Sequence, residues 1–191
     1  MNNNIIILAA LIFVGALSGC SISHPVAEGY PEYLAKYGNE GSLPPADLDA
    51  NYIIDGQTQN HRYEFRAATV GYAHLWIVEF GKILDETLNA PYVQSTFDRL
   101  EKGELADANK GNLIAFTLDS YEFDNYRAKV SMTIKLMEDG QEMLNKSYSA
   151  EGSSKGGQMW GAGPFAMKSA TLDSTRSAID KILTQFINEL P

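Results

Sequence analysis

The spacing of apolar and polar residues divides the chain into three parts. Residues 5–17 are an uncharged apolar run, and residues 21–50 hold four prolines and three glycines with little periodicity. After residue 50, apolar positions recur at the spacings of strands and helices. We therefore expect a single folded domain over residues 51–191, preceded by a proline-rich tether over residues 20–50.

The first long periodic segment predicts an amphipathic helix over residues 73–88. Its apolar residues recur every three or four positions: Trp76, Phe80, Ile83, Leu84 and Leu88. Residues 52–54 and 62–70, before this helix, have the composition of short strands. Residues 92–100, after it, are expected to form a short strand followed by a helical turn.

Alternation with a period of two predicts an antiparallel meander over residues 113–150. Apolar residues occupy the even positions of 126–136 and polar residues the odd ones, as in a strand with one face in the core. Asp139-Gly140 is a strong hairpin sequence, so residues 144–150 are expected to return antiparallel. A second long helix is predicted from Pro164 to Leu190, with proline in its first turn.

Together these elements predict an α+β fold. We expect an antiparallel sheet of about four strands, with the two main helices packed on one face.

The segment Leu17-Ser18-Gly19-Cys20, directly after the apolar run, resembles a bacterial lipobox. The run has the length of a signal-peptide core and is shorter than the ~20 residues of a membrane-spanning helix. The resemblance implies that residues 1–19 are a lipoprotein signal peptide, cleaved between Gly19 and Cys20. It also implies a diacylglycerol and an N-acyl chain on Cys20, which together suffice for stable anchoring. An uncleaved N-terminal anchor and an ordinary secretory peptide are the alternatives.

Ser21 at the position after the lipidated cysteine resembles the pattern that leads to outer-membrane sorting in diderm bacteria. We therefore expect a protein anchored in the outer membrane by its lipid, with the domain facing the periplasm. Cys20 is the only cysteine, so its lipidation would leave no thiol for a disulfide.

The charge of the chain argues against nucleic acid as a partner. The 24 acidic and 15 basic residues give a formal net charge of −9. A chain of this charge has no general electrostatic attraction for a phosphate backbone.

The glycine-rich segment 152–163 does not have the spacing of a phosphate-binding loop. We interpret it as a flexible lip beside the hairpin. Met159 and Trp160 lie in its middle, and such large apolar side chains on a polar loop either pack into the domain or contact a partner. Both alternatives stay open, and Met159 and Trp160 are our candidate partner contacts.

The sequence offers no residues for catalysis, a metal or a bound cofactor. His24, His61 and His74 have neither the spacing nor the companion cysteines of a zinc site. The acidic residues Asp119 and Glu122, with Asp124, are expected to face solvent. We therefore predict that the protein is not an enzyme and that its only prosthetic group is the lipid on Cys20.

The order of these elements loosely resembles small periplasm-facing lipoproteins of the ABC-transport auxiliary and YajG-like kind. The resemblance rests on the Lys146-Ser147-Tyr148 to Gly156-Gly157 stretch and the alanine-rich start of the last helix. It implies a non-catalytic accessory subunit that docks onto a cell-envelope transport or assembly complex. Two alternatives remain: a periplasmic carrier of lipid or a small ligand, with a cavity beside Trp76, Phe80 and Ile83, and a structural subunit of a secretion or motility ring.

Overall fold

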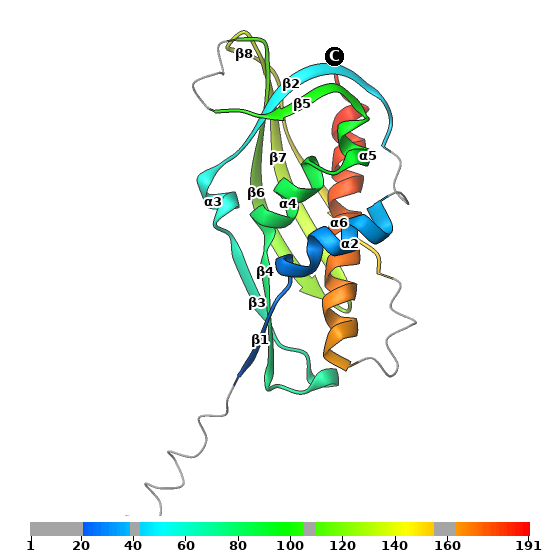
Figure 1. Ribbon diagram of the computed structural model, residues 1–191. Coiled ribbons are helices and arrows are strands. Elements are labelled where there is room, and N and C mark those ends of the chain that lie inside the picture. Colours follow the sequence, from blue (N-terminus) through cyan, green and yellow to red (C-terminus); the bar gives the residue numbers. More distant parts are fainter. Residues whose placement is uncertain (1–20, 39–42, 105–109, 155–162) are drawn as a thin grey trace, which may run out of the picture.

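A computed structural model describes residues 21–38, 43–104, 110–154 and 163–191. It confirms the α+β class, with two sheets and several helices (Figure 1). In the part of the chain that the structure describes, every helix is too short or too polar to span a bilayer.

The larger sheet is mixed and has five strands. Their spatial order is β5 (Phe97–Lys102), β2 (Ala46–Ile54), β6 (Asn112–Asp124), β7 (Arg127–Glu138) and β8 (Gln141–Glu151). The meander β6-β7-β8 is antiparallel, as predicted, but β2 runs parallel to both of its neighbours. Asp139 and Gly140 form the β7-β8 turn, and their positive φ angles of 47° and 81° are those that a two-residue hairpin needs.

A second sheet of three strands extends from the lower part of the molecule in Figure 1. Its order is β1 (Ile22–Pro25), β4 (His74–Glu79) and β3 (Arg62–Phe65), with β1 parallel and β3 antiparallel to β4. The prediction of one antiparallel sheet of about four strands was therefore wrong in number of sheets and in strand direction.

The predicted helix over residues 73–88 is correct only in its second half. Residues 74–79 form β4, and α4 (Phe80–Leu88) begins directly after it. Trp76, Ile77 and Val78 are all buried, as in a strand covered on both faces. The run matched a helical period because Trp76 and Phe80, four residues apart, both enter the core.

Two shorter predictions also change. Residues 91–102 form a helical turn, α5 (Pro91–Gln94), and then β5, the reverse of the expected order. The predicted strand over 62–70 is divided between β3 and a 3-10 turn, η3 (Ala68–Val70), and a short helix, α3 (Gly56–Gln59), precedes β3.

The predicted tether is part of the fold. Its described residues form β1, η1 (Ala27–Gly29), α2 (Tyr30–Tyr37) and the first half of β2. Val26, Tyr30 and Ala50 are buried, and the hydroxyls of Tyr30 and Thr87 share a hydrogen bond of 2.6 Å. The prolines of this segment suggested a tether, but they stand where a strand and a helix tolerate proline. Pro25 is the last residue of the edge strand β1, and Pro31 lies in the first turn of α2.

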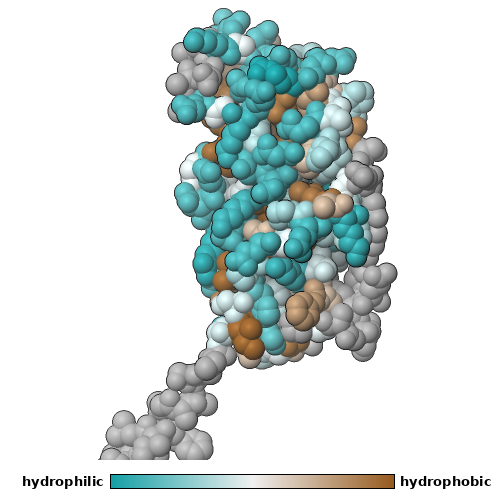
Figure 2. Space-filling model, viewed as in Figure 1, coloured by the Kyte–Doolittle hydropathy of each residue, from teal (hydrophilic) through white to brown (hydrophobic). Residues whose placement is uncertain are grey.

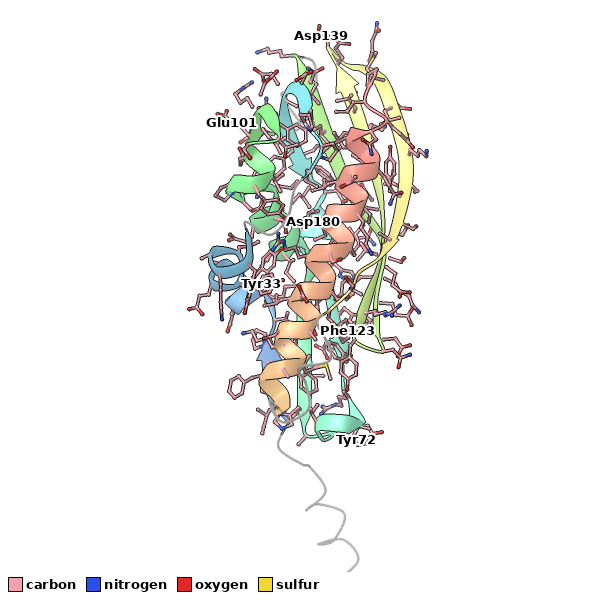
Figure 3. The ribbon with its side chains drawn as sticks, turned by 90° about the vertical axis from the view of Figure 1, so that its right-hand side faces the viewer. Tyr33, Tyr72, Glu101, Phe123, Asp139 and Asp180 are labelled. Carbon is pink, nitrogen blue, oxygen red and sulfur yellow. The ribbon has the colours of Figure 1, made fainter. Side chains whose placement is uncertain are left out.

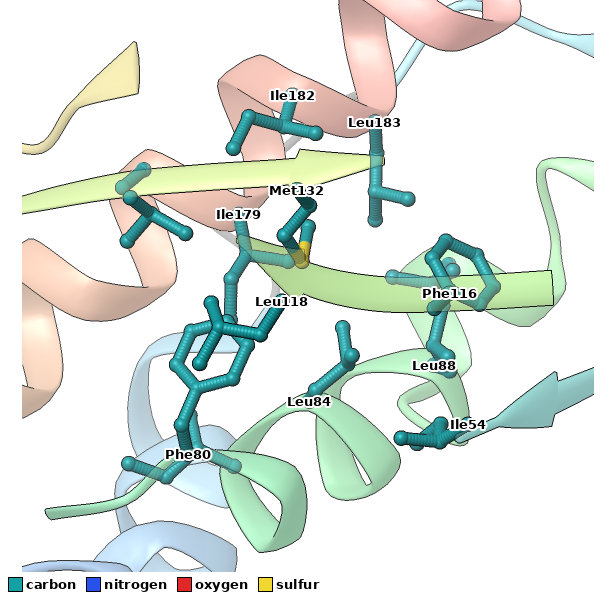
Figure 4. Packing of buried hydrophobic residues seen from close by; sticks show 14 of the residues in the cluster. Ile54, Phe80, Leu84, Leu88, Phe116, Leu118, Met132, Ile179, Ile182 and Leu183 are labelled. Carbon is teal, nitrogen blue, oxygen red and sulfur yellow. The ribbon is translucent and has the colours of Figure 1, made fainter. Parts of the chain in front are cut away.

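The core lies between the inner face of the larger sheet and the helices α4 and α6 (Gly163–Ile187). The alternation predicted for β7 is confirmed: Ala128, Val130, Met132, Ile134 and Leu136 are buried. Figure 4 shows Ile179 and Leu183 of α6 beside Met132, and Leu88 of α4 below Phe116.

Candidate functional site

Four residues that the sequence singled out lie outside the described residues: Gly19, Cys20, Met159 and Trp160. The description of the chain begins at Ser21, the residue after Cys20. The lower end in Figure 1 holds β1 with its exit toward residue 20, the η3 turn, and the first turn of α6. We call this the proximal end, made of residues 21–22, 66–73 and 163–167.

The first described residues are fastened to the fold. Ile22 pairs with His74, and its amide donates to the carbonyl of Ala73 at 2.8 Å. The guanidinium of Arg66 donates to the Ser21 hydroxyl at 3.0 Å and to the carbonyl of Tyr72. Ser21 is therefore an ordered part of the domain and not the start of a flexible arm.

The proximal end gathers exposed apolar side chains. Of the four large hydrophobic residues that are exposed among those described, three lie here: Ile22 at 50%, Tyr72 at 71% and Phe165 at 80%. The fourth, Met143, is on β8 near the opposite end. Figure 2 shows apolar side chains at the lower end, next to the point where the grey N-terminal segment leaves. Scattered apolar residues are ordinary on a surface, but a cluster of them indicates a contact site.

The chain segments at this end lack acidic residues. The three segments that build it and continue into the domain, residues 21–27, 65–78 and 163–172, contain no Asp or Glu. They do contain two basic residues, Arg66 and Lys168. In a chain of net charge −9, these three segments are neutral or basic. Asp124, at the end of β6, brings one carboxylate to this region, where it lines a pocket of about 220 Å³ together with Arg66.

Two of the three histidines meet just above this end. His24 Nε2 and His74 Nδ1 are 2.7 Å apart, and the His24 ring stacks on Trp76 at 5.5 Å between centroids. Burial, followed by the charges of His74 and Lys168, lowers the pKa of His24. The sequence missed this pair because it placed His24 in the tether. Across the described residues, no group of three or more His, Cys, Asp or Glu side chains is arranged to hold a metal ion.

The outer edge of β8 is a second exposed surface. No described strand pairs with that edge, and most of its side chains, from Gln141 to Glu151, are exposed. At the end of the strand, the Lys181 ammonium donates to the carbonyl of Glu151 at 2.7 Å. An edge strand of this length offers a row of backbone donors and acceptors to an incoming strand.

A buried polar cluster joins α2, α5 and α6. Arg176 donates to the carbonyls of Tyr37 and Gly38 at 2.6 and 3.3 Å, and its Nε lies 3.4 Å from the Asp180 carboxylate. Tyr92 donates to Asp180 at 2.6 Å, and burial raises the pKa of that carboxyl group. The cluster holds three helices together, so we assign it a structural role.

The other candidates from the sequence are also accounted for. Asp119 and Glu122 are exposed, as is Asp124, which agrees with the prediction that they face solvent. The Asp119 carboxylate accepts from the hydroxyls of Thr133 and Ser147 at about 3 Å. The carrier alternative would need a cavity beside Trp76, Phe80 and Ile83, and these three residues are fully buried in the packed core.

No family model and no curated protein matches this chain. A solved structure, that of protein XCC0632 from Xanthomonas campestris, described as DUF330, has a similar arrangement. It is 12% identical, covers 76% of this chain and 84% of its own length, and superposes with a TM-score of 0.48. At that level, the likeness carries no conclusion about the function of this chain.

Proposed function

We propose that the protein is a non-catalytic accessory lipoprotein, anchored through Cys20 in the outer membrane and docked from the periplasmic side onto a cell-envelope transport or assembly complex. The lipobox-like segment before Ser21 supports the anchor. The observation that carries the docking role is the open edge of β8.

The β8 edge suits a protein partner better than a small ligand. Its eleven residues pair antiparallel with β7, with one irregularity near Met143, so the pairing fixes the strand and its outer edge in the sheet. A partner strand added here would gain main-chain hydrogen bonds along the edge, with the alternate exposed side chains providing specificity. The Met159-Trp160 pair, eight residues beyond the end of β8, is a second proposed contact.

The absence of an enzyme function is part of the proposal. Among the described residues, the side chains with strongly perturbed pKa values serve as structural hydrogen-bond partners. Tyr92 joins α5 to Asp180 of α6, and Tyr121 bonds Thr175 across the core. Both tyrosines are therefore engaged in hydrogen bonds within the fold. The Asp55 carboxylate likewise caps α3 by accepting from two backbone amides.

The test is site-specific photocrosslinking in living cells. A photoreactive amino acid replaces Asn145, which is exposed on β8, in the full-length chain with a C-terminal tag. The matched control places it at Asp98, exposed on β5 at the other edge of the same sheet. We expect one defined set of envelope proteins to crosslink at position 145 and not at 98, and Cys20→Ala to abolish that crosslink.

The same experiment separates the alternatives. Crosslinks to phospholipid or a small ligand alone, with no stoichiometric protein, would replace the docking role with that of a carrier. Crosslinks solely to further copies of this chain, in a discrete ring, would favour a structural subunit. A second probe at Trp160 shows whether the glycine-rich loop contacts the same partner.

A further inference from the structure

We infer that the proximal end is a lipid-contact surface, which seats the domain directly on the bilayer through Ile22, Tyr72 and Phe165. The inference rests on the proposed lipid anchor at Cys20 and adds what the anchor alone does not give, the orientation and height of the domain. The occupant of this surface is the headgroup region of the membrane.

Covalent geometry provides the first step. Two residues span at most about 7 Å when fully extended, so Ile22 lies within that distance of a lipidated Cys20. The headgroup layer of one leaflet is itself about 5–8 Å thick. Because Ile22 is fixed to β4 through its pairing with His74, a lipid on Cys20 would keep this end of the domain near the headgroups. A long tether would let this end move far from the membrane, but only Ser21 separates Cys20 from β1. Whether this end then rests on the headgroups depends on its exposed side chains.

The exposed side chains provide the second step. Tyr72 lies on the loop after η3, and Phe165 lies in the first turn of α6, so three separate elements contribute one apolar residue each. Figure 3 places Tyr72 at the end of the molecule opposite Asp139. Aromatic side chains with an apolar body and a polar tip, such as tyrosine, are enriched at the depth of the headgroups.

Charge provides the third step. Bacterial membranes contain anionic lipids, which repel carboxylates and attract nearby Lys and Arg side chains. Arg66 lies in the proximal end and Lys168 follows its last segment, and the chain segments around both contain no acidic residue. Asp124 of β6 is a carboxylate beside Arg66. The opposite end carries Glu138, Asp139 and Glu142 around the β7-β8 turn. The charge distribution therefore favours the orientation in which the proximal end faces the membrane.

The experiment measures the depth of a nitroxide label in lipidated, full-length protein reconstituted into vesicles of phosphatidylethanolamine with a minority of phosphatidylglycerol. Because Cys20 is the only cysteine and bears the lipid, Ala73→Cys supplies a single thiol next to Tyr72. Met143→Cys supplies the matched label at the opposite end. We expect the label at 73 to be several-fold less accessible to a water-soluble nickel relaxant than the label at 143.

A double substitution tests the named side chains. Tyr72→Glu with Phe165→Glu, both at exposed positions where folding tolerates a polar residue, should return the label at 73 to full aqueous access while the protein still floats with the vesicles. Met143→Glu should leave the label at 73 shielded. Circular dichroism confirms that each variant is folded.

The failures are distinguishable. Equal accessibility at 73 and 143 in protein that floats with vesicles overturns the contact surface and leaves the anchor intact. A wild-type chain that is not lipidated and does not float removes the anchor and the proposed function with it. If a photoreactive residue at Tyr72 crosslinks in cells to a protein instead of lipid, the surface belongs to a partner and the inference fails.

Discussion

At the scale of single residues, the buried guanidinium of Arg176 is the most demanding feature of the fold. Arg176 is only 5% exposed, its guanidinium lies over the Tyr92 ring at 4.7 Å, and its Nε is 3.4 Å from the partly buried Asp180 carboxylate. It also satisfies the carbonyls of Tyr37 and Gly38 at the end of α2. One side chain thus pairs with the charge of Asp180 and donates hydrogen bonds to carbonyl groups at the end of α2.

Arg176→Met should therefore destabilise the domain strongly. The substitution preserves most of the volume but leaves the partly buried Asp180 carboxylate without its cation. Removing one partner of a fully buried pair costs about 3–5 kcal/mol, and we expect a loss toward the lower end of that range. The free energy of unfolding from urea titration measures this loss. The control is Arg62→Met, which removes an exposed ion pair with Glu64. It should change the free energy of unfolding by less than about 1 kcal/mol. Equal effects of the two substitutions would contradict the structural role of Arg176.

The burial of His61 makes the stability of the domain depend on pH. Its ring packs against Phe80 and Tyr121, and burial lowers its pKa from the ordinary value of 6.5. The unfolded chain therefore binds a proton more readily than the folded one, and this contribution to stability is lost as the pH falls below about 6.5. His24, whose pKa is also lowered by burial, acts in the same direction.

We expect the melting temperature to fall between about pH 7 and pH 5.5, a range in which few carboxylates titrate. His61→Gln should reduce the size of that fall, as measured by calorimetry at both pH values, and His24→Gln should reduce it further. An undiminished fall in the double variant would show that other groups control the pH dependence.

At the scale of elements, close approach between α3 and α4 depends on a glycine. A Cβ atom on Gly81 would lie 2.5 Å from the backbone of Gln59 and 2.6 Å from the carbonyl of Thr58. Thr58 is buried, and its hydroxyl accepts from the amide of Leu118 on β6 at 2.6 Å. The short helix is therefore clamped between α4 and the larger sheet.

Gly81→Ala should accordingly cost about 1–3 kcal/mol, since backbone atoms on α3 have to shift to admit the methyl group. Gly56→Ala is the matched control because nothing lies within 4 Å of its Cβ position. Alanine there should be neutral or slightly stabilising, as it restricts the unfolded chain. Chemical denaturation of both variants measures the difference, and a neutral Gly81→Ala would mean that the two helices are farther apart than described.

The elements that the sequence predicted correctly are those whose environment is uniform along their length. The alternation in β7 marks one face in the core and one in water, and the long apolar stripe of α6 covers a single sheet face. The helix over 73–88 was wrong in its first half because a strand buried on both faces loses its alternation. The parallel pairing of β2 has no local cause, since its partners β5 and β6 come from later in the chain.

The proximal end was also beyond prediction from the sequence alone. Ile22, Tyr72 and Phe165 are far apart in the chain and belong to no repeating pattern. Their juxtaposition depends on the β1-β4 pairing, which the proline-rich composition around Pro25 concealed. The local indication of this surface is the absence of carboxylates from residues 65–78. That absence points to a surface only once the fold places these residues beside 21–27 and 163–172.

At the scale of the whole molecule, the two ends differ in chemical character. One end presents exposed apolar residues and Arg66, and the other presents the acidic β7-β8 turn around Asp139 (Figure 3). The open β8 edge runs between the two ends. A domain seated by its proximal end would present that edge along the membrane normal, within reach of a partner that stands beside it.

The parallel pairing of β1 with β4 has a mechanical consequence. A pull on Ser21 directed along β1 would load its hydrogen bonds to β4 together, in shear. A hairpin strand pulled from its open end would instead break its bonds one after another. Four paired residues and the Val26 amide, which donates to the carbonyl of Ile77 at 2.8 Å, would therefore share the tension that the proposed lipid anchor transmits to the domain.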